Sequence, residues 1–96
     1  MIFEWDPEKA KRNLREHGVS FEEAATVFFD PLAMTYRDPD HSDEEDREIT
    51  IGYSTNQRLL FVSHVQQANH TRIISAREAT RRERKQHEEG HTEKTR

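Results

Sequence analysis

Four consecutive apolar residues, Leu59–Val62, constrain the fold more than any other part of the sequence. Such a short run in a highly charged chain is typical of the central, most buried strand of a sheet. The segment before it alternates, with Ile49 and Ile51 on one side and polar residues on the other, as a strand with one covered face requires. A turn at 55–57 joins these two strands, and the segment at 71–76 is expected to pair next to the central one. The patterns predict an antiparallel sheet.

Two helices are predicted before this sheet. Residues 3–5 form a short opening strand, and Asp6–Pro7 then start a helix, because Asp caps free N–H groups and Pro fits the first helical position. The helix ends at Gly18, which supplies the left-handed residue that follows many helices. Ser20–Glu23 is a capping box and predicts a second helix, which stops near Asp30–Pro31.

The remaining segments complete one domain. A strand at 32–37 leads into an acidic loop at 38–46, and a basic helix from about Glu78 to Gly90 closes the chain. We therefore expect a single domain at 1–90 and a disordered tail at 91–96. The predicted fold class is α+β: an antiparallel sheet of about four strands, flanked by two N-terminal helices and one C-terminal helix.

Charge is divided unevenly along the chain. Residues 1–50 carry 6 Lys and Arg against 14 Asp and Glu, whereas residues 51–96 carry 9 against 5. Attraction of a polyanion depends on the local field and not on the total charge of the chain, so the second half is the candidate nucleic-acid-binding side.

Several classes of protein are excluded by residues that the sequence lacks. The chain has no cysteine, which excludes disulfides, cysteine–zinc sites and thiol nucleophiles. Its three glycines form no phosphate-binding loop, so no nucleotide cofactor is expected. It has no apolar stretch of membrane-spanning length, and a cytoplasmic location is expected.

Basic residues in the second half form the main candidate site. Strand periodicity places Arg58 and His64 on one face of the central strand, near the arginines of the next strand. Cleavage of RNA without a metal needs groups that move protons, for which His is suited, and a cation that stabilises the phosphate. The predicted catalytic residues are Arg58, His64, Arg72 and Arg77, and the predicted RNA-binding residues are Arg81, Arg82 and Lys85. A solvated basic face with a salt-bridged helix is the alternative interpretation.

Two further patterns resemble metal sites. His87–His91 matches the H-E-x-x-H pattern of zinc peptidases, but the pattern contains a Gly at the expected helix end and lacks room for a supporting shell. The acidic loop offers Asp38, Asp40, His41 and Asp43, but it lacks the Gly and distal Glu of a calcium-binding loop. A solvated loop, or a surface for a basic partner, is the preferred interpretation, and no metal site is predicted.

Four segments, in the expected order, resemble the BrnT family of bacterial type II toxins. They cover roughly Phe3 to Glu89: FEWDPEKAKRNLREHGVSFEEAATVFFDP, DREITIGYS, RLLFVSHV and RIISAREATRRERKQHEEG. The resemblance implies a RelE-like ribonuclease fold and a toxin that degrades RNA and arrests translation. It also implies neutralisation by a ribbon-helix-helix antitoxin, BrnA, through which the complex would bind operator DNA. The arginines at 58, 72, 77 and 81 and His64 match the family pattern.

The sequence departs from that pattern after the central strand. An acidic residue and an Arg commonly stand where this chain has Gln66 and Gln67, and a Tyr often stands in place of His87. An alternative function is therefore a catalytically weak or inactive module that acts mainly as antitoxin partner and co-repressor. A disordered antitoxin segment that folds over the basic site would serve either function.

Overall fold

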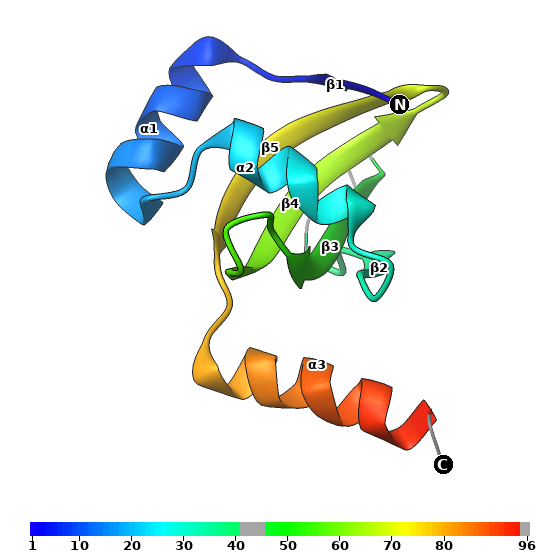
Figure 1. The fold of residues 1–96 in the computed structure, drawn as a ribbon. Helices are drawn as coiled ribbons and strands as arrows, with labels where there is room; N and C mark the ends of the chain where they lie inside the picture. The colour runs from blue at the N-terminus through cyan, green and yellow to red at the C-terminus, as the bar shows by residue number, and fades with distance from the viewer. Residues whose placement is uncertain (41–45, 95–96) are drawn as a thin grey trace.

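The order of the five strands in the sheet decides which surfaces are available for binding. The computed structural model describes the backbone of residues 1–40 and 46–94, and the side chains of these residues except 91–94. The strands lie in the order β1-β5-β4-β3-β2, with β4 in the centre as predicted. Their bounds are β1 Ile2–Glu4, β2 Met34–Arg37, β3 Arg47–Tyr53, β4 Leu59–Gln67 and β5 His70–Glu78 (Figure 1).

The sheet is mixed, which corrects the prediction of about four antiparallel strands. β2, β3, β4 and β5 pair antiparallel, but β1 pairs parallel with β5, from Ile2 beside His70 to Glu4 beside Arg72. The antiparallel pairs follow from short connections, whereas β1 reaches β5 from the other end of the chain. Local sequence patterns carry no information on such a pairing.

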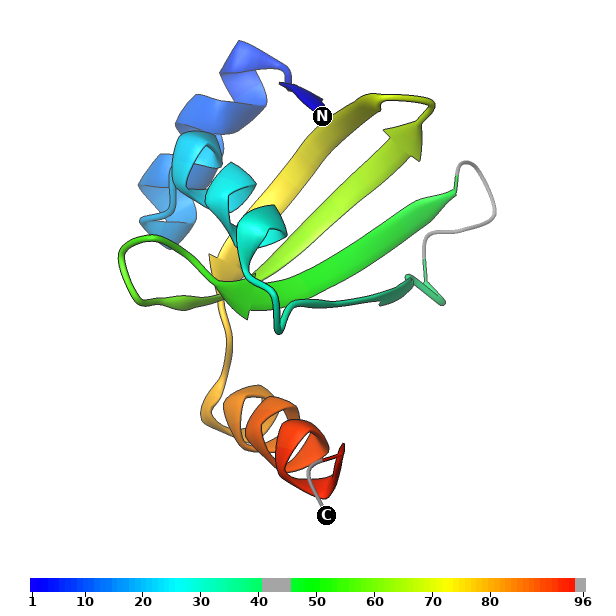
Figure 2. The same ribbon diagram turned by 45° about the vertical axis from the view of Figure 1, so that its right-hand side comes forward.

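Two short helices and a 3₁₀ turn cover one face of this sheet. They are α1 Pro7–His17, α2 Phe21–Thr26 and η1 Val27–Phe29. Asp6 and Ser20 cap the N-termini of the two α-helices as predicted. Asp6 accepts a hydrogen bond from the Glu8 N–H, and Gly18 has a φ of 68°. Figure 2 shows α1, α2 and η1 together on one side of the strands.

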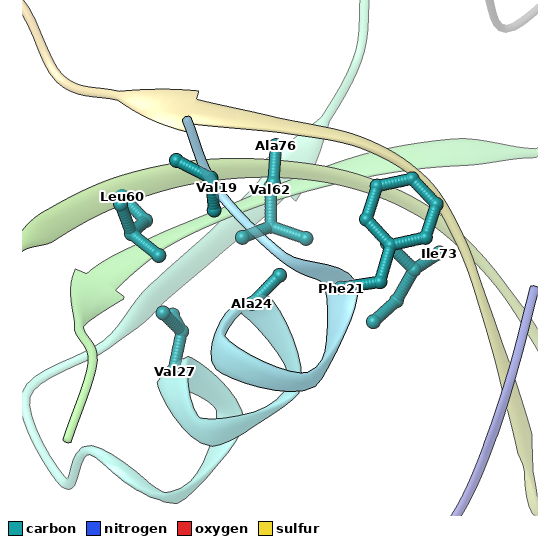
Figure 3. Packing of buried hydrophobic residues seen from close by; sticks show 8 residues of the cluster. All are labelled: Val19, Phe21, Ala24, Val27, Leu60, Val62, Ile73 and Ala76. Atoms are coloured by element: carbon teal, nitrogen blue, oxygen red, sulfur yellow. The ribbon is translucent and has the colours of Figure 1, made fainter. Parts of the chain in front are cut away.

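The hydrophobic core fills the space between these helices and the sheet (Figure 3). Phe21, Leu60 and Val62 are fully buried within it. The central strand contributes alternate residues, so its residues at 59, 61 and 63 point to the opposite face. The complete buried cluster is Val19, Phe21, Ala24, Val27, Leu60, Val62, Ile73 and Ala76.

Asn13 closes the edge of β5 where β1 no longer covers it. Its side-chain amide donates to the carbonyl of Ala76 at 2.8 Å, and its oxygen accepts from the Ala76 N–H at 3.1 Å. The same amide donates to the carbonyl of Val19 at 2.9 Å. Asn13 is 6% exposed, so these hydrogen bonds are shielded from water. Asn13 thus replaces a neighbouring strand and joins α1, the α1–α2 turn and the sheet.

The C-terminal helix α3, Arg81–Lys94, lies apart from α1 and α2 beyond the end of β5 (Figure 1). Thr80 and Glu83 form a reciprocal capping box: the Glu83 N–H donates to the Thr80 hydroxyl, and the Thr80 N–H donates to the Glu83 carboxylate. The helix continues through Gly90 to Lys94, so the predicted helix end at Gly90 is wrong. Residues 95–96 lie outside the described chain.

Gly52 provides a test of how closely η1 and the following turn pack on β3. A Cβ atom added at this position would lie 2.9 Å from the Cβ of Ala33 and 3.0 Å from Cγ1 of Val27. We expect Gly52→Ala to lower the free energy of unfolding by about 1–3 kcal/mol, as overpacking does. In Gly90→Ala, the matched control, the new methyl group meets no atom within 4 Å and should not destabilise the helix. Urea denaturation measures both, and equal stability of the two variants would contradict this packing.

Candidate nucleic-acid interface

The sheet face opposite α1 and α2 carries basic and aromatic residues. Along β4 this face is formed by Phe61, Ser63 and Val65, because alternate residues of a strand share a face. Their partners in β5 are Arg77, Ser75 and Arg72, and their partners in β3 are Ile51, Ile49 and Arg47. We call this surface the open face. It combines three arginines with an aromatic ring.

A groove of about 660 Å³ runs across the open face from β2 to β5. We call it the Arg77 groove. Arginines at both ends and serines between them provide donors for a phosphate, and rings provide surfaces for a base. Residues that line it include Tyr36, Asp38, Arg47, Phe61, Ser75 and Arg77.

The guanidinium of Arg77 is held in a fixed position at this groove. Its two terminal nitrogens bind the two carboxylate oxygens of Glu83 at 2.8 and 2.9 Å, and its central carbon lies 4.4 Å from the centre of the Phe61 ring. The carboxylate of Glu83 raises the pKa of Arg77, and the guanidinium lowers the pKa of Glu83 to about 2. Nη1 also donates to the Glu78 carbonyl, which leaves Nε–H and one Nη2–H for a ligand.

Tyr36 adds an accessible aromatic ring next to Arg77. Its side chain is 45% exposed, and its ring packs edge-on against Phe61 with 6.3 Å between centroids. Burial of the phenol, and then the negative charge of Glu83, raise the pKa of Tyr36, so the phenol keeps its proton at neutral pH. An exposed ring beside a fixed guanidinium offers a stacking surface for a base and a cation for a phosphate.

His64 does not line this groove, so the structure does not bring the four predicted catalytic residues together. It shares a face with Leu60 and Val62 as predicted, but α2 and η1 cover that face and leave His64 2% exposed. Its Nε2 shares a hydrogen bond of 2.7 Å with the Thr50 hydroxyl, and its ring packs edge-on against Phe28 at 4.8 Å. Its Nδ1 has no hydrogen-bond partner among the described residues. His64 and Arg77 therefore lie on opposite sides of the sheet.

Burial of His64 predicts a specific acid sensitivity. Removal from water lowers the pKa of His64 from its ordinary 6.5 to about 4. Between these values the unfolded chain binds a proton that the folded chain does not, so stability falls as the pH drops through this window. We expect about 2 kcal/mol of stability to be lost from this group between pH 7 and pH 5. Urea denaturation at both pH values should show that His64→Gln removes this part of the loss; an unchanged loss would contradict the assignment.

Arg58 also lies on the covered side, where it serves the structure. Its Nε donates to the carboxylate of Glu23 at 2.9 Å, and a terminal nitrogen donates to the Gly18 carbonyl at 3.0 Å. Ser54 donates to the same carboxylate at 2.7 Å. The hydrogen bond from Arg58 is the largest cause that lowers the pKa of Glu23, to about 2. The sequence predicted a capping role for Glu23; its carboxylate instead binds Arg58 and Ser54.

The other predicted residues are divided between the open face and α3. Arg72 lies on the open face at the register of Val65, half-buried and nearer the start of β5 than Arg77. The three predicted RNA-binding residues on α3 are exposed and do not line the Arg77 groove. These three are Arg81, Arg82 and Lys85. The residue of α3 that contacts Arg77 is Glu83.

Sequence reasoning missed the aromatic and β3 components of the interface. Phe61 lies in the apolar run that predicts the most buried strand, although alternation with Leu60 and Val62 could have placed it on the other face. Tyr36 could have been found from its place in a strand next to an acidic loop. Arg47 could have been found from the predicted pairing of its strand with the central one.

The two metal-like patterns give no assembled site in the described part of the chain. No three His, Asp or Glu side chains come together there. His87 lies against Tyr53, with 6.2 Å between ring centroids, and the side chain of His91 is outside the described residues. Of the acidic loop, Asp38 accepts a hydrogen bond from the Asp40 N–H, and residues 41–45 are outside the described chain.

The substituted pair Gln66–Gln67 lies at the far end of β4 from the Arg77 groove. The Gln66 amide oxygen accepts a hydrogen bond from the Thr71 hydroxyl, and its nitrogen donates to the Ala68 carbonyl. Phe61 and Gln67 are six residues apart on one strand, a distance of ~20 Å at the usual rise. The departure from the family pattern therefore does not alter the surroundings of Arg77.

A small α+β protein with helices on one sheet face, and arginines and aromatic rings in a groove on the other, has the features of a nucleic-acid-binding protein. The comparison with known families agrees with this class. A family profile described as the ribonuclease toxin BrnT of type II toxin–antitoxin systems matches residues 5–83. The chain belongs to this BrnT family, as its sequence patterns predicted.

A solved structure confirms the fold. The crystal structure of the Brucella abortus ribonuclease toxin BrnT is similar to this chain, with a TM-score of 0.65 and 21% identity. The similarity covers 84% of this chain and 100% of the Brucella chain. No match was found among curated proteins. None of the described helices is long and apolar enough to cross a membrane.

Proposed function

We propose that this protein is an endoribonuclease toxin that binds and cleaves RNA on the open face, at the Arg77 groove. The position of Arg77 carries the proposal: its guanidinium is fixed by Glu83, lies over Phe61 and keeps donors for a phosphate. This assignment retains Arg77 and Arg72 from the predicted catalytic residues. It gives His64 and Arg58 structural roles on the covered face.

The proposed reaction needs no metal ion. The 2′-oxygen of a ribose attacks the adjacent phosphorus, the bond to the 5′-oxygen breaks, and the products end in a 2′,3′-cyclic phosphate and a 5′-hydroxyl. Arg77 stabilises the negative charge that grows on the phosphate oxygens, and Tyr36 holds a neighbouring base. The groove offers the phenol of Tyr36 and the carboxylate of Asp38 for the two proton transfers.

In the cell, this reaction would arrest translation in the cytoplasm. The proposed partner is a BrnA-like ribbon-helix-helix antitoxin, which would neutralise the toxin in a heteromeric complex and bring the complex to operator DNA. An antitoxin segment that folds over the Arg77 groove would block RNA directly. The net negative charge of residues 1–50 supports a second contact with a basic DNA-binding partner.

A cleavage assay tests the proposed function. Purified protein is incubated with an end-labelled RNA of mixed sequence, with and without EDTA, and the product ends are identified by mass spectrometry. We expect internal cuts that resist EDTA and leave 2′,3′-cyclic phosphates. No cleavage by folded protein, on free RNA or in a translation extract, would contradict the proposal and favour the antitoxin-binding module. Cleavage that EDTA abolishes would contradict its metal independence.

A further inference from the structure

A second cavity separates α3 from the open face. It has a volume of about 260 Å³ and is distinct from the Arg77 groove, although Tyr36 and Phe61 line both. Its sheet side is apolar, with Met34 and Ile51. Its helix side carries Glu83, Gln86 and His87, one turn apart on α3. We call this cavity the α3 pocket.

The α3 pocket has the size and lining of a site for one flat, partly polar ring. Pockets for drug-sized ligands have volumes of about 300–1,000 Å³, so this one accepts a smaller group such as a nucleobase. Apolar and aromatic side chains form most of its wall, which favours the faces of a base. The Gln86 amide is exposed and makes no hydrogen bond to the described residues, so its donor and its acceptor remain available for a base edge.

The α3 pocket lies next to the proposed phosphate site. Glu83 lines the pocket and binds both terminal nitrogens of Arg77, and Phe61 lines the pocket and lies under the same guanidinium. A nucleotide whose phosphate binds Arg77 therefore has its base within reach of this pocket.

We infer that the α3 pocket binds the base of the nucleotide at the cleavage site and that Gln86 reads its edge. This inference rests on the proposed function. A Gln amide matches the donor and acceptor of adenine in a bidentate pair, whereas a carboxylate accepts from the amino group of cytosine. The pocket thus selects adenine, and Gln86 determines that preference.

Four short RNAs that differ in one base at the cleavage position test the inference. We expect the wild-type protein to cleave the adenine RNA about fivefold or more faster than the others, in line with one bidentate pair. Gln86→Ala should remove the preference, and Gln86→Glu should favour the cytosine RNA. Glu89→Gln, an exposed position on α3 that does not line the pocket, should retain the adenine preference. A base preference identical in all four proteins would overturn the inference.

Failure of the proposed function gives a different result from failure of the inference. If no RNA is cleaved, the proposed function fails, and binding of adenosine 3′-monophosphate then tests the pocket directly. The methyl resonance of Ile51, which lines the pocket, should shift on addition of this nucleotide in the wild type and not in Gln86→Ala. No shift in the wild type would overturn the inference.

Discussion

Arg77→Ala is expected to reduce RNA cleavage by about 10²- to 10³-fold while the protein remains folded, because the loss of one positioned donor to a reacting oxyanion has this effect. The change removes the guanidinium that Glu83 and Phe61 fix at the groove. Arg77→Lys should recover part of the activity, since Lys keeps the charge but not the planar pair of donors. Cleavage rates with a single RNA measure the effect.

A matched variant on the opposite side of the sheet makes this result specific. Arg58→Lys retains a cation beside Glu23 and alters an arginine that lies outside the groove. Its cleavage rate should stay close to that of the wild type once the folded fraction is taken into account. Equal losses in Arg77→Ala and Arg58→Lys would contradict the assignment of the open face, and full activity of Arg77→Ala would remove Arg77 from the mechanism.

Asn13→Ala should be the most destabilising single substitution outside the apolar core, with a loss of about 4 kcal/mol. It leaves the Ala76 N–H, the Ala76 carbonyl and the Val19 carbonyl without the partner that Asn13 provides. Each buried polar group without a partner costs about 1–3 kcal/mol. A small domain has about 5–15 kcal/mol in total, so this variant should be close to unfolding. Urea denaturation followed by circular dichroism measures the change.

One further variant separates hydrogen bonding from side-chain size at this position, and a second, at an exposed position, is the control. Asn13→Asp keeps the shape but places a carboxylate against two carbonyls, so it should destabilise at least as much as Asn13→Ala. Asn69→Ala, at an exposed turn position, should change stability by less than about 0.5 kcal/mol. A small effect of Asn13→Asp would show that the amide donors do not hold the edge of β5.

Local patterns predicted most of the secondary structure. The alternation around Ile49 and Ile51 predicted β3, and the apolar run at 59–62 predicted the central strand β4. The capping residues Asp6 and Gly18 predicted the two ends of α1. These features depend on residues within one element. The helix end expected at Gly90 was wrong because a single glycine costs only about 1 kcal/mol in a helix.

The candidate site was harder to predict because it depends on which sheet face the helices cover. The alternation of side chains along a strand correctly placed Arg58 and His64 on the same face. Both faces of β4 are apolar near Leu60 and Phe61, so the pattern does not show which face the helices cover. The residues of the open face come from β2, β3, β4 and β5. Only the register of these strands brings Tyr36, Arg47 and Arg77 to one groove.

Isoleucine methyl NMR tests most directly whether RNA binds the open face. Ile49 and Ile51 belong to the open face, whereas Ile73 lies in the core beneath the helices. A short RNA with 2′-O-methyl groups binds without being cut, because the attacking hydroxyl is blocked. We predict that titration with this RNA shifts the methyl resonances of Ile49 and Ile51 and leaves that of Ile73 in place. Shifts at Ile73 with none at Ile49 and Ile51 would place the RNA on the other side of the sheet and contradict binding to the open face.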